Sequence, residues 1–172
     1  MIFLTVGTQL PFDRLVRAVD LWAESRGRRD IFGQISDPGP SGYRPKNFDW
    51  ASDLAPAEFE ARFHRASHIV SHAGMGTIIS ALGEDKPLLI MPRRAHLGEQ
   101  RNDHQHATAK RFGTRPGILA ALDEKELPEK MDVLVASTVS MTGEGTAGAA
   151  ATSIGRFADR RLTDRIRSMI LD

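Results

Sequence analysis

The sequence predicts a doubly wound, Rossmann-like α/β domain, with a mostly parallel sheet between two layers of helices. Three observations predict it. Short apolar runs typical of buried strands recur along the chain, stretches with apolar residues at helical spacing separate them, and polar or glycine-containing segments follow several of the runs. Strands that alternate with helices of this length form βαβ units, in which the sheet is parallel and helices cover both of its faces.

The expected strands and helices alternate as far as about residue 112. The expected strands are residues 2–6, 31–35, 48–50, 69–71 and 87–91. The expected helices, in which apolar residues recur at helical spacing, are residues 12–23, 56–66, 77–83 and 102–112. Pro11 and Pro56 stand where the first turn of a helix tolerates proline, and the turn-rich residues 36–42 close the second strand.

Two later segments differ in composition from this pattern. Residues 142–152 are rich in Gly, Ala and Thr, which is typical of a flexible connector. In residues 153–172 apolar side chains recur on one face of an expected amphipathic helix, and arginines occupy the opposite face. The arginine face is open to two interpretations, contact with an anionic membrane or a partner, or exposure to water on a helix that docks on its own domain. The expected organisation is an α/β domain over residues 1–141, a connector over 142–152 and a terminal helix over 153–172.

Composition and charge exclude several classes of protein. The sequence has no cysteine, which excludes a disulfide framework, a thiolate zinc site and a cysteine nucleophile. The formal net charge is +1, so overall charge gives no reason to expect a nucleic-acid partner. The longest apolar runs are far shorter than a bilayer-spanning helix, and the N-terminus lacks the basic flank and cleavage site of a signal peptide. We therefore expect a soluble, cytoplasmic protein.

The strongest local signal is the sequence His-Ala-Gly-Met-Gly-Thr at residues 72–77, where an expected strand meets an expected helix. Glycines let the main chain approach a ligand closely, and a helix N-terminus offers unpaired N–H groups and a partial positive charge. A phosphate or diphosphate fits this arrangement, with Thr77 and His72 as additional donors. Taken alone, so short a pattern is equally typical of a tight β-to-α turn without a ligand.

Two further polar segments are expected at the same edge of the sheet. Gly7, Thr8 and Gln9 follow the first strand, and the donor- and acceptor-rich residues 92–105 follow the strand at 87–91. Each alone is an ordinary turn or a solvated loop. The carboxyl ends of parallel strands share one edge, so the three segments together indicate a binding site in the crevice there.

Metal and nucleophile sites are not indicated. His104 and His106 are two residues apart and do not share a helix face. Nothing resembles the turn that presents a nucleophilic serine. We expect no metal, no other cofactor and no covalent intermediate.

Several ordered motifs carry a resemblance to a known family. They are Val-Gly-Thr with Pro-Phe-Asp at residues 6–13, the segment at 72–77, Lys-Pro-Leu-Leu-Ile-Met-Pro-Arg at 86–93, and Asn-Asp-His-Gln at 102–105 with Ala107. Together they resemble the C-terminal domain of glycosyltransferase family 28, the nucleotide-sugar-binding half of GT-B enzymes. The short length and Thr-Val-Gly-Thr at residues 5–8 look closer to split versions, the soluble subunits of dolichol-linked N-acetylglucosaminyl transfer and of bacterial exopolysaccharide glucuronosyl transfer. The segment at 98–105 makes the bacterial kind the nearer match, and the resemblance covers roughly the first 115 residues.

The resemblance implies roles for particular residues. His72 and the main chain of 73–77 would hold the donor diphosphate, with Gly7 and Thr8 closing over it. Residues 53–55 would read uracil through main-chain groups, although a plain loop before a helix explains them almost as well. His104 and Gln105 match a polar pair that contacts the donor sugar, with Arg93 as a candidate for a phosphate or a glucuronate carboxylate. The expected donor-binding residues are Gly7, Thr8, Leu54, Ala55, His72, Ala73, Gly74, Met75, Gly76, Thr77, Arg93, Glu99, Asn102, His104 and Gln105.

The resemblance also implies a reaction. We expect an inverting, single-displacement transfer from a UDP-sugar to a lipid-linked acceptor in polysaccharide biosynthesis. The first strand already belongs to the donor half, so we expect the acceptor surface and the catalytic base on a membrane-associated partner subunit, and we name no base in this sequence. The partner would hold the protein at the inner face of the membrane. Two alternatives stay open: a non-catalytic UDP-sugar-binding or scaffold subunit, and a small hydrolase acting on nucleotide sugars, which would need an internal base.

Overall fold

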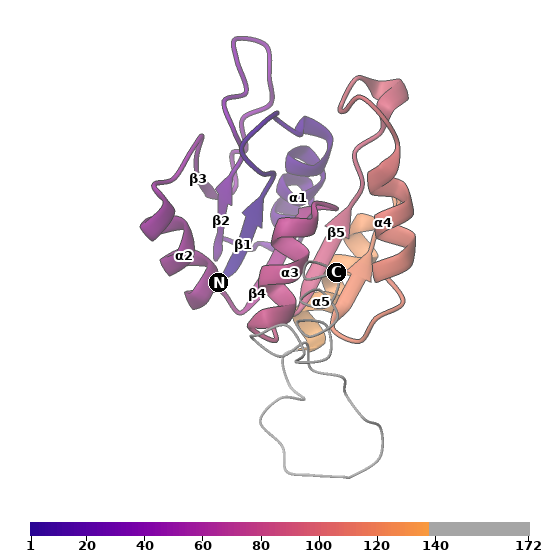
Figure 1. The fold of residues 1–172 in the computed structure, drawn as a ribbon. Coiled ribbons are helices and arrows are strands. Elements are labelled where there is room, and N and C mark those ends of the chain that lie inside the picture. Colours follow the sequence, from indigo (N-terminus) through magenta and orange to yellow (C-terminus); the bar gives the residue numbers. More distant parts are fainter. Residues whose placement is uncertain (138–172) are drawn as a thin grey trace, which may run out of the picture.

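The computed structural model describes residues 1–137 and folds them around one sheet of six parallel strands (Figure 1). The strands are β1 (Ile2–Thr5), β2 (Ile31–Gln34), β3 (Asp49–Ala51), β4 (His68–His72), β5 (Leu88–Met91) and β6 (Ile118–Ala120). The helices are α1 (Asp13–Arg26), α2 (Pro56–Arg65), α3 (Met75–Gly83), α4 (His104–Phe112) and α5 (Leu127–Ala136), with a 3-10 turn at Ala95–Leu97. The predicted connector and terminal helix, residues 142–172, lie outside the described residues.

The predicted doubly wound α/β fold is confirmed, and the sheet has one strand more than the sequence analysis predicted. The strand order is β3-β2-β1-β4-β5-β6, and every neighbouring pair is parallel. Strand β6 and helix α5, which the sequence analysis left without an element, extend the sheet past β5 and cover it. Strand β6 is three residues long and follows Pro116 and Gly117, so its apolar signal is too short to be recognised by pattern.

Helices cover both faces of the sheet, as Figure 1 shows, with α1 and α5 on one side and α2, α3 and α4 on the other. Successive side chains of a strand point to opposite faces, so each strand feeds two cores. In β1, Ile2 and Leu4 pack under α1, whereas Phe3 packs under α2 and α3. Because both faces are buried, the central strands carry apolar residues in succession and do not alternate between apolar and polar ones.

The order of the strands reverses between β1 and β4. From β1 the chain proceeds outward to β2 and β3, then returns to β4 on the other side of β1. The connections that leave the carboxyl ends of β1 and β4 therefore diverge and open a crevice, the position where doubly wound sheets bind ligands. Thr5 ends β1 in register with Gln34 of β2 and Ser71 of β4, so polar groups already meet at this edge.

Among the helices described here, none combines the length and apolar character needed to cross a bilayer.

Candidate functional site

A cavity of about 1070 Å³ opens at the carboxyl ends of β1 and β4. Three segments form its walls: the loop after β1, the β4–α3 turn, and residues 100–105, which lead into the first turn of α4. The structure thus brings together the three polar segments that the sequence placed at one edge of the sheet. The predicted residues that line the cavity are Gly7, Thr8, His72, Gly74, Met75, Gly76, Thr77, Arg93, Asn102, His104 and Gln105.

The N-terminus of α3 is open toward this cavity. Helix α3 begins at Met75 after Gly74, whose main chain is extended, and no side chain caps this helix end. The N–H groups of the first turn have no partners within a helix, and they carry the positive end of its dipole. Gly76 lies in this turn, is exposed, and would point a Cβ into open space. An anion in the cavity can therefore approach these N–H groups without a side chain in the way.

The imidazole of His72 is held between two glycines. A Cβ on Gly74 would collide with the ring, and a Cβ on Gly7 would lie 2.9 Å from Cε1 of His72. Gly7 also has a φ of +81°, a left-handed conformation that favours glycine. The two glycines of the predicted phosphate segments therefore make room for the histidine as well as for a ligand.

His72 is neutral at pH 7 in the absence of an anion. Burial of the ring and the nearby positive charge of Arg93 lower the pKa of His72 to about 4, against a smaller opposing effect from a hydrogen bond to the Thr5 main chain. Ser71 Oγ lies 3.3 Å from Nδ1 of the ring. A neutral imidazole still offers a hydrogen bond to a phosphate, and a bound anion would raise its pKa.

The lowered pKa predicts a pH-dependent difference in stability between the wild type and His72→Gln. Above pH 6.5, His72 is neutral in both the folded and the unfolded protein. As the pH falls from 6.5 to about 4, the unfolded chain takes up a proton that the folded protein excludes. The free energy of unfolding of the wild type, measured relative to His72→Gln, should therefore fall by roughly 3 kcal/mol across that window and then level off. Urea denaturation at a series of pH values measures it.

The control for that comparison is His96→Gln, which removes an exposed histidine from the 3-10 turn. This variant shows how much of the pH dependence follows from replacing a histidine by glutamine elsewhere in the protein. A flat difference for His72→Gln would show that the imidazole titrates normally and is not enclosed as the structure has it.

The floor of the cavity contains a residue that the sequence analysis missed. Gln34 ends β2, is 2% exposed, and lines the cavity. Its Oε1 accepts from Thr5 Oγ1 at 2.7 Å, and its Nε2 donates to the carbonyls of Gly7 at 3.1 Å and Ser52 at 3.2 Å. Gln34 thus ties the loop after β1 to the end of β3. The sequence could have indicated Gln34, because it is a polar residue at the carboxyl end of an expected strand, as are the residues of the three polar segments.

The third wall is a small set of side-chain amides and an imidazole. Gln105 is 4% exposed, accepts from the Arg93 N–H at 3.1 Å and donates to Gln100 Oε1 at 2.6 Å. His104 contacts Asn102 and lies 3.2 Å from Gln100 Nε2. Asn102 and His104 are exposed on the cavity side, so their polar groups are available to a ligand.

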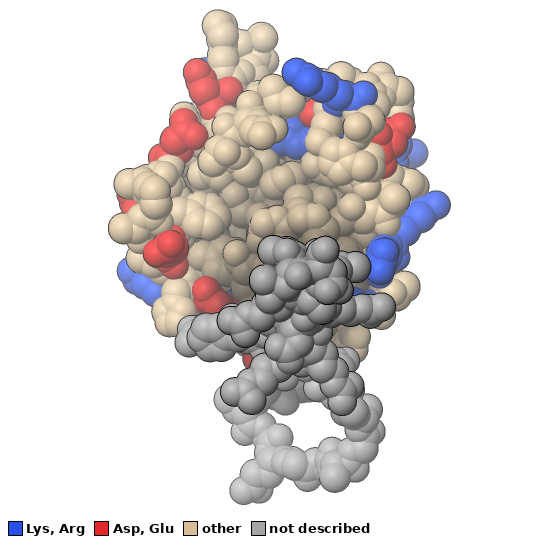
Figure 2. All heavy atoms as spheres, viewed as in Figure 1, with Lys and Arg blue, Asp and Glu red and all other residues tan. Residues whose placement is uncertain are grey.

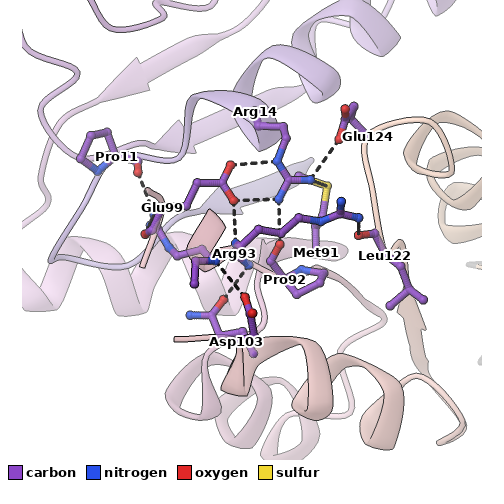
Figure 3. A network of polar contacts seen from close by, with 12 residues as sticks. Pro11, Arg14, Met91, Pro92, Arg93, Glu99, Asp103, Leu122 and Glu124 are labelled. Atoms are coloured by element: carbon purple, nitrogen blue, oxygen red, sulfur yellow. Dashed lines mark hydrogen bonds and ion pairs between the residues drawn. The ribbon is translucent and has the colours of Figure 1, made fainter. Parts of the chain in front are cut away.

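Two predicted residues of this region are directed elsewhere. The Arg93 guanidinium donates to main-chain carbonyls, and the Glu99 carboxylate accepts from Arg14 at 2.8 Å through both Nε and Nη2 (Figure 3). Glu99 does not line the cavity. The neighbouring Arg94 is half-buried and donates to the Leu122 carbonyl at 2.9 Å.

Three other predicted residues lie beside the cavity and not in its lining. Ala73 is 2% exposed and packs in the core under α3. Leu54 packs against the same core, and Ala55 immediately precedes α2. The neighbouring Phe59 of α2 does line the cavity, so this side of the site is apolar and aromatic.

On the part of the face with α2, α3 and α4 that Figure 2 leaves uncovered, uncharged residues fill most of the centre and most charged residues lie around the margin. Helix α3 itself contains no charged residue. Within residues 1–137, no three His, Asp or Glu side chains gather where they could hold a metal ion.

Comparison with solved structures supports the fold. The glycosyltransferase of kitacinnamycin has a TM-score of 0.54 and 17% identity over 81% of this chain and 34% of that chain. Glycosyltransferase VinC, solved in complex with DTDP, has a TM-score of 0.51 and 21% identity over 78% of this chain and 33% of that chain. The chain therefore spans about a third of the length of these two proteins. None of the curated protein sequences compared with the chain matches it.

The profile of a protein family matches a larger part of the chain than these structures do. The profile of the glycosyltransferase family 28 C-terminal domain matches residues 1–153, which includes every strand and helix described above. The family resemblance read from the motifs is thereby confirmed. This chain belongs to the glycosyltransferase family 28 C-terminal domain family.

Proposed function

We propose that this chain binds a UDP-sugar in the cavity and acts as the donor-binding part of a two-component inverting glycosyltransferase. The observation that carries the proposal is the uncapped N-terminus of α3, which opens beside His72 into a cavity walled by the predicted motifs. A glucuronate donor and a lipid-linked acceptor in polysaccharide biosynthesis are the specific substrates that we propose.

The diphosphate is placed at the start of α3. There the N–H groups of the first turn and the His72 imidazole would share its negative charge. The same groups would stabilise the charge that grows on UDP as the glycosidic bond breaks, so they contribute to transfer as well as to binding. The solved complex of VinC with DTDP supports a nucleotide ligand for this fold.

The two ends of the donor follow from the walls of the cavity. The uracil would lie toward Phe59 and the loop at residues 54–55, where an aromatic ring and main-chain groups are available. The sugar would lie toward Asn102, His104 and Gln105, whose amide and imidazole groups suit hydroxyl groups. The cavity volume of about 1070 Å³ accommodates a ligand of this size.

The remaining parts of the reaction are assigned to a partner. We propose that a membrane-associated subunit binds the acceptor, supplies the general base and holds this chain at the inner face of the membrane. No residue of this chain is proposed as the base. Inversion by single displacement needs the acceptor hydroxyl on the side of the sugar opposite UDP, and the partner would place it there.

Nucleotide binding is the direct test. UDP should bind the purified chain and, at about 100 times its Kd, raise the free energy of unfolding by about 2.7 kcal/mol. For a chain of this size that corresponds to a rise in melting temperature of roughly 5–10 °C. Calorimetry and thermal melting with UDP, UDP-glucuronate, UDP-N-acetylglucosamine, dTDP and ADP measure the effect and rank the ligands.

The relative affinities of these ligands test each part of the proposed donor site. Tighter binding of uridine nucleotides than of ADP supports the uracil assignment, and a preference for UDP-glucuronate supports the donor assignment. If no nucleotide at millimolar concentration changes the melting curve, the proposed donor site is wrong. Binding without transfer, even in the presence of a partner, would indicate a non-catalytic UDP-sugar-binding subunit.

A further inference from the structure

Arg93 is a buried cation at the cavity for which the described residues provide no ion pair. It follows β5, is 4% exposed and lines the cavity. Its guanidinium carbon lies 4.7 Å from the centre of the Phe12 ring. Within residues 1–137, the ion pairs of this region join Arg14 to Glu99 and Glu124, and none includes Arg93.

The guanidinium is bound by main-chain oxygens alone. Nη2 donates to the carbonyls of Val6 at 2.9 Å and Leu10 at 2.6 Å. Nη1 donates to the carbonyls of Pro11 at 2.7 Å and Glu99 at 3.4 Å. Four contacts occupy the four N–H groups of the two terminal nitrogens, so these nitrogens are committed to the protein and not to a ligand.

Three of these carbonyls lie at the two ends of the loop after β1, which forms one wall of the cavity. Val6 precedes the loop at residues 7–10, and Leu10 and Pro11 end it, so one guanidinium joins both ends of the loop. The Glu99 carbonyl adds the segment that leads to the opposite wall. The loop at residues 7–10 has few other means of holding its shape, since Thr8, Gln9 and Leu10 are exposed.

The Glu99 carboxylate is bound by partners other than Arg93. Both of its carboxylate oxygens accept from Arg14, and Oε2 also accepts from the Arg94 N–H at 2.8 Å (Figure 3). Arg14 in turn donates to Glu124 and to the Pro92 carbonyl. The Glu99 charge, which also acts on Arg93 through space, is therefore shared with another arginine, and within residues 1–137 no carboxylate forms an ion pair with Arg93.

We propose that Arg93 is a positioning residue of the donor site, which fixes the loop at residues 7–10 and supplies a permanent positive charge to the cavity without touching the donor. This inference rests on the proposed function for the identity of the ligand. It assigns to Arg93 a role through the main chain and through space, in place of the direct contact with a phosphate or a carboxylate that the sequence indicated.

Two consequences of the charge are already visible. Burial lowers the pKa of Arg93 to about 10, which still leaves it charged at neutral pH. The same charge contributes to the lowered pKa of His72, so it acts at the position proposed for the diphosphate. In a partly buried site such a charge is weakly screened, so it favours an anion over a neutral ligand.

The experiment separates the two parts of the role with two substitutions in the full chain. Arg93→Met removes both the charge and the carbonyl contacts, whereas Arg93→Lys keeps the charge and cannot reproduce the four contacts. Arg94→Met is the control, since the neighbouring guanidinium contacts Leu122 outside the cavity. Affinities for UDP and for uridine, which lacks the charged groups, are measured by calorimetry and by NMR titration, and the His72 pKa is measured by NMR without ligand.

In Arg93→Met the ratio of UDP affinity to uridine affinity should fall at least about tenfold. In Arg93→Lys both affinities should fall, while their ratio stays within about threefold of the wild type. The His72 pKa should rise in Arg93→Met and change little in Arg93→Lys, and Arg94→Met should behave as wild type in every measurement.

Different results would contradict different parts of the proposal. A folded Arg93→Met protein with the wild-type ratio and His72 pKa would show that the guanidinium supports the fold alone. Arg93→Lys with unchanged affinities would refute the positioning of the loop, and it remains informative if Arg93→Met does not fold. Failure of the wild type to bind UDP refutes the proposed function instead, and the His72 pKa in the variants then decides the role of the charge.

Discussion

Replacing Gly76 with valine should abolish UDP binding while the protein stays folded. Gly76 lies in the first turn of α3, is exposed, and lines the cavity. A valine side chain would stand in front of the N–H groups proposed to receive the diphosphate. Because a Cβ at this position meets no atom of the protein, the substitution costs nothing in packing, and it slightly favours the helix. We expect the affinity for UDP to fall at least about a hundredfold.

Gly83→Val is the matched control for this substitution. Gly83 belongs to the same helix, a Cβ there also meets no atom, and it lies at the far end from the cavity. Both variants should melt close to the wild type without ligand, and only Gly83→Val should retain the rise in melting temperature with UDP. Equal UDP affinity in all three proteins would remove the N-terminus of α3 from the binding site.

The fold could be predicted because its central elements carry strong local patterns. Strand β5 is apolar throughout, β1 is apolar as far as Leu4, and β4 has an apolar centre at residues 69–70, since both faces of the sheet are buried; the helices between these strands have one apolar face. The edge of the sheet carried less information. In β6 only Ile118 is buried, and in α5 only Leu127, Met131 and Leu134 are buried, so neither segment stands out from a loop.

The location of the cavity could also be predicted, because glycines and polar residues after parallel strands necessarily meet at one edge. The direction of each long side chain could not. The sequence shows that Arg93 and Glu99 stand in a polar loop, but not that carbonyls from residues 6–11 come within reach of Arg93 or that Arg14 reaches Glu99 across the fold. The role of Gln34 was not predicted for a related reason: its hydrogen-bond partners Thr5, Gly7 and Ser52 cannot be inferred from the residues next to it in the sequence.

The groups at the cavity suit the proposed binding of a donor, but they do not include everything that catalysis needs. The groups at the cavity are suited to holding a diphosphate and stabilising its charge: helix N–H groups, a neutral imidazole and a nearby buried cation. Transfer also requires an acceptor hydroxyl held in line with the bond that breaks, and a base that removes its proton. The described residues form one sheet with one such crevice, and the chain spans about a third of the two glycosyltransferases compared with it.

Under the proposed two-component function, the purified chain should bind the donor but show almost no transfer to a lipid-linked acceptor. We expect a rate at least about a thousandfold below that of the complete enzyme, because the acceptor and the base would be absent from the site. A radiolabelled UDP-sugar, incubated with the chain alone and then with membranes that contain the candidate acceptor-binding subunit, measures the difference. Gly76→Val with the same membranes is the control, and it should stay inactive, which ties any transfer to the cavity of this chain. Efficient transfer by the chain alone, in a preparation free of membranes, would overturn the two-component proposal and place the base within this sequence.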